Sequence, residues 1–141
     1  MYRGFQKTKR EKFRMKTYSG SCHCGNVSFE FETEMSTAVR CNCSFCTRRG
    51  ALLHGVPPEN FRVMKGDVET PNGAKTYGSG IFQHHFCPCC GIQCFTRRHG
   101  RGKYGPQVRI NLNCVDGVDP DNLSVRDFDG AAMPEDNTTW E

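Results

Sequence analysis

The sequence lacks both an apolar run long enough to cross a membrane and a secretory leader. None of its hydrophobic stretches approaches the roughly 20 residues that span a bilayer. The N-terminal residues are rich in lysine and arginine, with no apolar segment of the kind that a signal peptide carries. We therefore expect an intracellular, cytoplasmic protein with no membrane partner.

Helical periodicity is also scarce, and no internal repeat of fixed period is present. The 141 residues are enough for one domain of ordinary size and too few for two with substantial cores. Alternation of apolar and polar residues marks short strands instead, as at Val27, Phe29 and Phe31. Glycines and prolines separate these segments. The pattern predicts a mainly β domain, with bound zinc compensating for a modest apolar fraction.

Several of the expected strands lead into cysteines. Residues 37–41 form a return strand that ends at Cys41, and residues 43–49 then form a tight turn or a short helix. Later in the chain Val108, Ile110 and Leu112 alternate as a strand that runs into Cys114.

The formal charge of +4 has an uneven distribution that argues against a nucleic-acid-binding body. Seven of the 19 lysines and arginines lie in the first 16 residues beside a single acid, so the rest of the chain is slightly acidic. We expect a basic N-terminal arm over residues 1–17, the domain over 18–133 and a polar tail over 134–141. We do not expect contact with nucleic acid except through this arm.

Ten cysteines are an unusual number for a chain of this length. In an intracellular protein thiols stay reduced, so closely spaced cysteines are metal ligands in preference to disulfides. The spacing agrees, because a CxC pair is awkward for an intrachain disulfide and the chain contains SCHCG, CNCSFC and CPCC. A secreted protein would restore the disulfide interpretation.

One candidate metal site combines an early and a late cysteine pair. Glycines beside these pairs, Gly25 and Gly91, can adopt the positive φ that a turn around a metal requires. Two such pairs form a closed tetrahedral zinc site with a structural role. Its expected ligands are Cys22, Cys24, Cys87 and Cys90, with Cys89 pointing elsewhere.

A second candidate site lies in CNCSFCTRRG, where three thiols fall within six residues. Catalytic zinc sites use three protein ligands and keep a fourth position open, so Cys41, Cys43 and Cys46 predict an open site. Three thiolates on Zn²⁺ carry a net charge of −1, which suits the binding of an external thiolate better than the formation of hydroxide. Arg48 and Arg49 can pair with carboxylates of such a ligand or form a solvated basic turn.

The remaining cysteines keep the second site's coordination open. Cys89, Cys94 and Cys114 are each a candidate fourth ligand, a free buried thiol or an oxidation-sensitive residue. A fourth ligand would close the site and give it a structural role.

The cysteine motifs resemble those of the glutathione-dependent formaldehyde-activating enzymes, a family that includes the centromere protein V relatives. The resemblance runs through SCHCGNVSFE, CNCSFCTRRGALL, VPPENFRV, GSGIFQHHFCPCCGIQCF and, more loosely, RINLNCVDGVDPDNLSVRDFDG. It implies the Mss4-like fold, in which small antiparallel sheets surround zinc. Cys89 and Cys94 lie outside the family motif.

The resemblance also implies an activity. Cys22, Cys24, Cys87 and Cys90 would hold structural zinc, while Cys41, Cys43 and Cys46 would hold catalytic zinc where glutathione acts, giving two zinc ions per chain with the second labile. The implied enzyme is a carbon–sulfur lyase that joins glutathione and formaldehyde into S-hydroxymethylglutathione. Since a shared fold does not guarantee a shared reaction, the alternative is a non-catalytic zinc module that binds a protein or a nucleic acid.

Overall fold

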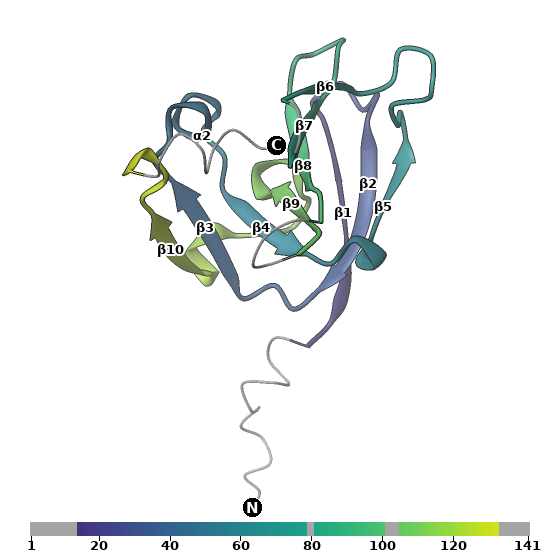
Figure 1. The fold of residues 1–141 in the computed structure, drawn as a ribbon. Helices are drawn as coiled ribbons and strands as arrows, with labels where there is room; N and C mark the ends of the chain where they lie inside the picture. The colour runs from purple at the N-terminus through teal and green to yellow at the C-terminus, as the bar shows by residue number, and fades with distance from the viewer. Residues whose placement is uncertain (1–13, 79–80, 101–104, 133–141) are drawn as a thin grey trace, which may run out of the picture.

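A computed structural model describes residues 14–78, 81–100 and 105–132, which form two β-sheets and one short α-helix (Figure 1). The expected basic arm lies outside these residues as far as residue 13, and its last two residues begin the first strand at Lys16. The expected polar tail lies outside them entirely. No helix in the described part is long and apolar enough to span a membrane.

The smaller sheet has three antiparallel strands in the order β1-β2-β5, which are β1 (Lys16–Ser21), β2 (Ser28–Thr33) and β5 (Phe61–Lys65). The alternation along β2 sends Phe29 and Phe31 into the interior. Gly20 on β1 lies opposite Phe29, and any Cβ there would overlap the Phe29 ring and the Cys114 carbonyl oxygen. The strands can therefore approach the core closely at this point.

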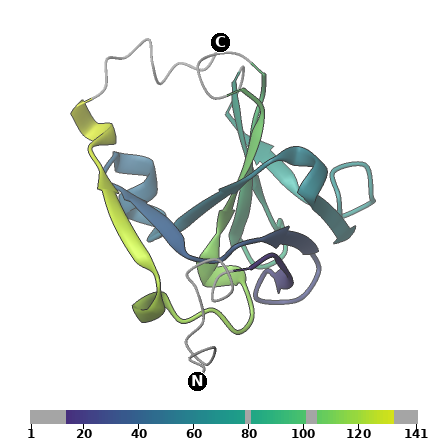
Figure 2. The ribbon, with the colours of Figure 1, turned by 90° about the horizontal axis from the view of Figure 1, so that it is seen from below.

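The larger sheet has seven strands in the order β10-β3-β4-β9-β8-β7-β6. They are β3 (Thr37–Cys41), β4 (Leu53–Val56), β6 (Lys75–Tyr77), β7 (Phe82–Phe86), β8 (Gln93–Arg98), β9 (Gln107–Asn111) and β10 (Ser124–Phe128). All neighbours are antiparallel except β10 and β3, which run parallel. The view from below shows β10 along the outer side of β3 (Figure 2).

The hydrophobic core lies between the two sheets. Phe29 of β2 and Phe61 of β5 both contact Phe95 of β8, with ring centroids 5.9 Å and 4.7 Å away. Ile110 of β9 is fully buried in the same cluster. Each such side chain stabilises the fold by about 1.5–3 kcal/mol relative to an exposed one, so the core holds the two cysteine-bearing sheets in a fixed relation.

The predicted mainly β fold of small antiparallel sheets is confirmed, with the parallel β10 as an addition. The expected strand into Cys114 is shorter than predicted, because β9 ends at Asn111 and a 3-10 turn, η3 (Leu112–Cys114), follows. The Asn111 side chain accepts a hydrogen bond from the Asn113 amide at 3.2 Å, which stabilises the turn over a continued strand.

Candidate metal centres

Four cysteines from distant parts of the chain converge at the ends of both sheets. Their sulfur atoms, from Cys22, Cys24, Cys87 and Cys90, all lie within 4.8 Å of one another. The Sγ of Cys24 is 3.8 Å from that of Cys22 and 3.7 Å from that of Cys87. Ligands on a tetrahedral zinc with bonds of about 2.3 Å are separated by roughly 3.8 Å, so the donor set and its spacing fit Zn²⁺.

The backbone around this cluster turns about the sulfurs and donates hydrogen bonds to one of them. Gly25 and Gly91 adopt φ values of 83° and 81°, which turn the chain after each cysteine pair. The amides of Cys89 and Cys90 donate to the Cys87 Sγ at 3.3 and 3.5 Å. Burial acts to raise the pKa of Cys87, but these amides outweigh it and lower the pKa to about 6. The side chain of Cys89 is exposed and lies outside the cluster.

A second cluster is formed by Cys41, Cys43 and Cys46, whose sulfur atoms also lie within 4.8 Å of one another. Cys41 ends β3, and Cys43 caps the N-terminus of α2 (Ser44–Arg49) by accepting a hydrogen bond from the Cys46 amide at 3.4 Å. Gly50 ends the helix in the left-handed conformation. One turn of helix therefore brings three closely spaced thiols to one point.

No further cysteine, histidine, aspartate or glutamate among the described residues joins this trio. Cys114 instead donates to the Gln93 carbonyl oxygen at 3.8 Å. Cys94 is fully buried, and the neighbouring Cys114 thiol together with burial raises its pKa. A metal bound by the trio would keep a coordination position for an external ligand.

The thiols of the trio differ in acidity. Burial raises the pKa of Cys46 to about 11, even though Arg49 acts against it. At Cys43 burial also acts to raise the pKa, but hydrogen bonds from the Cys46 amide and from both neighbouring thiols lower it overall. A metal would displace the remaining protons, so its affinity should increase with pH.

The two arginines predicted beside the trio have different surroundings. Arg49 donates from Nη2 to the Cys46 Sγ at 3.3 Å, and its Nη1 donates to the Gln93 Oε1. Arg48 is exposed and donates to the Ser44 carbonyl oxygen at 3.3 Å. Arg48 is thus free to reorient toward a ligand, while Arg49 is held against the sulfur.

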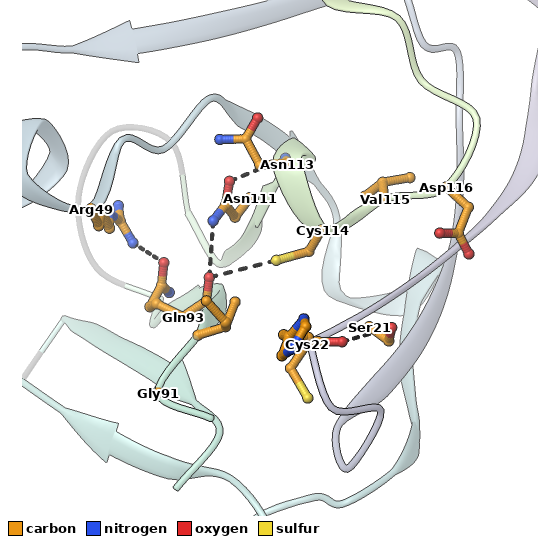
Figure 3. Close-up of a pocket in the computed structure, with 12 residues that line it drawn as sticks. Ser21, Cys22, Arg49, Gly91, Gln93, Asn111, Asn113, Cys114, Val115 and Asp116 are labelled. Atoms are coloured by element: carbon orange, nitrogen blue, oxygen red, sulfur yellow. Dashed lines mark hydrogen bonds between the residues drawn. The ribbon is translucent and has the colours of Figure 1, made fainter. Parts of the chain in front are cut away.

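Two cavities lie near the metal centres, and only the first is lined by cysteines of the trio. One, of about 570 Å³, is bordered by Cys41, Cys46, Phe128 and Asp129. The other, of about 550 Å³, is lined by Cys22 and by Arg49 with its partner Gln93 (Figure 3). Figure 3 also shows the Gln93 carbonyl oxygen receiving hydrogen bonds from Asn111 and Cys114.

No local sequence pattern points to two residues that organise the site, Gln93 and Asn42. Gln93 belongs to no motif for catalysis or metal binding, and its role depends on the fold that brings β8 next to α2. Asn42 accepts from the Ala131 amide at 2.8 Å and donates to Asp129 at 2.9 Å, which ties the chain after β10 to the cysteine loop. Both contacts join residues more than 40 positions apart.

Comparison with known proteins gives a family match and a structural match. Residues 17–126 match the family model described as glutathione-dependent formaldehyde-activating enzyme. A crystal structure of a Rhodobacter sphaeroides protein, solved as a structural-genomics target, is 32% identical with a TM-score of 0.62, and the match covers 77% of this chain and 99% of that one.

Proposed function

The chain belongs to the family of glutathione-dependent formaldehyde-activating enzymes, and from this premise we propose that it is a zinc-dependent carbon–sulfur lyase that forms S-hydroxymethylglutathione from formaldehyde and glutathione or a related thiol. Family membership supports a zinc-binding, glutathione-related function in general terms. The particular reaction and the roles of individual residues are our proposal.

The observation that carries the proposal is the convergence of Cys41, Cys43 and Cys46 without a fourth protein ligand among the described residues. A closed four-cysteine site elsewhere in the chain provides the contrast. We assign the structural metal to Cys22, Cys24, Cys87 and Cys90. The trio is the catalytic site, and its zinc is the more labile because fewer protein ligands hold it.

A zinc ion in the trio would supply a position at which a thiol can lose its proton and bind as a thiolate. Three cysteine thiolates leave such a centre with a net charge of −1, so it is a weak source of hydroxide. Thiol addition suits this donor set better than hydrolysis.

The reaction itself is an addition. The glutathione sulfur forms a bond to the formaldehyde carbon, the carbon–oxygen π bond breaks, and the thiol proton is delivered to the resulting oxygen. The cavity beside Cys41 and Cys46 has room for a tripeptide thiol next to the trio. Arg48 does not line this cavity, but it is exposed and follows the lining residue Thr47, so it can pair with a carboxylate of a glutathione bound beside the trio. Arg49 contributes its positive charge at Cys46.

Metal analysis with matched variants tests the proposal. Purified wild-type protein should contain two zinc ions per chain, and Cys43→Ala should lose one of them together with glutathione-dependent formaldehyde consumption. Cys114→Ala is the control, because its thiol lies outside both clusters, and it should retain both ions and the activity. A wild-type protein with a single zinc and no glutathione-dependent formaldehyde consumption would refute the proposal.

A further inference from the structure

Building on the proposed function, we propose that Gln93 is a positioning residue of the three-cysteine site, which acts by holding the Arg49 guanidinium against the Cys46 sulfur. Gln93 and Arg49 lie 44 positions apart in the sequence, so their contact depends on the fold. The arrangement is a chain of contacts from the β8 backbone through Gln93 and Arg49 to Cys46.

The orientation of the Gln93 side chain is determined by two donor bonds. Its Nε2 donates to the Phe95 carbonyl oxygen at 2.7 Å and to the Thr96 Oγ1 at 3.2 Å. A carbonyl oxygen can only accept, so the amide nitrogen must occupy this side and the Oε1 must face away. That oxygen accepts from Arg49 Nη1. Gln93 is therefore a fixed acceptor on a strand of the larger sheet.

Arg49 is also restrained by an aromatic ring. Its guanidinium lies over the Phe45 ring, with the Cζ 4.6 Å from the ring centroid. The Phe45 ring in turn packs on His84, with centroids 4.3 Å apart. The planar guanidinium, held by Gln93 and Phe45, then directs Nη2 to the Cys46 Sγ at 3.3 Å. A lysine at this position has a single ammonium group and lacks the rigid fork that reaches both partners.

This contact matters because of the charge that the site must accommodate. A zinc ion with three thiolates has a net charge of −1, and a fourth thiolate from glutathione raises it to −2. Cys46 is 7% exposed, so this charge develops in a poorly solvated place. The guanidinium offsets one negative charge at the ligand sulfur. Through Arg49, Gln93 thus favours an anionic ligand in the open position.

Cobalt substitution provides a direct test, because the sulfur-to-cobalt charge-transfer band reports on the ligand sulfurs themselves. Zinc-depleted protein is titrated with Co²⁺, and the second equivalent is assigned to the trio by its loss in Cys43→Ala. The variants are Gln93→Leu, Arg49→Leu and Arg49→Lys, with Arg126→Leu, an exposed arginine on β10 outside both cysteine clusters, as the control. Circular dichroism and the first cobalt equivalent verify that each variant is folded.

We expect Gln93→Leu, Arg49→Leu and Arg49→Lys to bind the second cobalt about 10- to 100-fold more weakly, with a charge-transfer band at lower energy, since a sulfur without its hydrogen bond is more easily oxidised. Arg126→Leu should resemble the wild type in cobalt affinity, band energy and glutathione binding. Added glutathione should bind more weakly to the cobalt protein in the three affected variants.

The possible outcomes distinguish the positioning role of Gln93 from the proposed function. Two cobalt ions in the wild type, with unchanged affinity and band energy in Arg49→Leu and in Gln93→Leu, overturn this inference and leave the proposed function standing. Equal effects of Arg126→Leu and Arg49→Leu also overturn it, because a general charge effect then suffices. A wild type that takes up a single cobalt overturns the proposed function itself.

Discussion

Gly130 lies directly against Cys41. A Cβ at residue 130 would overlap the Cys41 Sγ and would lie 3.3 Å from the Cys43 Cβ. The glycine begins the 3-10 turn η5 (Gly130–Ala132), which follows β10 and is tied to the cysteine loop through Asn42. The end of the described domain thus forms one wall of the trio, and it leaves no room for a methyl group.

Replacement of Gly130 by alanine should therefore displace the Cys41 sulfur and weaken metal binding at the trio. We expect the second zinc to bind at least about 10-fold more weakly, as measured by competition with a chromophoric chelator, while the first zinc is retained. Gly100→Ala is the matched control, because no atom of the described residues lies within 4 Å of a Cβ built there. Unchanged affinity for the second zinc in Gly130→Ala would show that this wall is less tight than the structure has it.

A second prediction contrasts two cysteines in the CPCC run. Cys87→Ser removes a buried sulfur of the four-cysteine cluster, whereas Cys89→Ser replaces an exposed side chain outside it. In the assignment proposed above, a structural zinc at this cluster would contribute a large part of the total stability of about 5–15 kcal/mol, so Cys87→Ser should be largely unfolded. The free energy of unfolding of Cys89→Ser, measured in urea, should lie within about 0.5 kcal/mol of that of the wild type. Similar losses in both variants would contradict the ligand assignment.

Some of this arrangement follows from local sequence and some does not. The alternation at Val27, Phe29 and Phe31 is a direct record of burial, so it predicts β2 correctly. The strand β10 was not predicted, because its residues are mostly exposed and its partner β3 lies more than 80 positions earlier. Closely spaced cysteines indicate metal binding by their chemistry alone. The roles of Gln93 and Gly130 depend on nonlocal packing, which no local pattern reports.

A third prediction concerns acid stability and rests on His54, which links the two sheets. Its Nδ1 donates to the Thr37 carbonyl oxygen at 2.8 Å, and its Nε2 pairs with the Thr33 hydroxyl at 2.8 Å. Burial lowers the pKa of His54 below its usual value of 6.5. The unfolded chain therefore binds the proton first, and stability falls as the pH drops below about 6.5.

His54→Gln should lose about 1–3 kcal/mol of stability at pH 7, because hydrogen bonds of a buried group are disrupted. The difference between wild type and variant should shrink as the pH falls from 7 toward 5, since glutamine carries no such penalty. Urea unfolding of both proteins at several pH values measures this difference. Any effect of metal loss on stability at low pH is common to both proteins and cancels in the comparison. A difference that stays constant over this range would contradict the assignment.

A fourth prediction separates the two arginines of α2. Exposed Arg48 contacts substrate in the proposed function, so Arg48→Ala should raise KM for glutathione about fivefold with little change in kcat, the behaviour of uniform binding. Arg126→Ala, an exposed arginine on β10, serves as the control and should leave both constants unchanged. Equal KM values for Arg48→Ala and the wild type would show that Arg48 does not contact glutathione.

The most direct test of the central claim is the rate at which formaldehyde exchanges between its hydrate and S-hydroxymethylglutathione, measured by exchange NMR with ¹³C-labelled formaldehyde. The reaction proceeds without a catalyst, so the rate with protein must be compared with the rate in its absence. The account predicts faster exchange with the two-zinc protein and no acceleration with Cys43→Ala. An exchange rate that is the same with wild-type protein, with Cys43→Ala and without protein would contradict it.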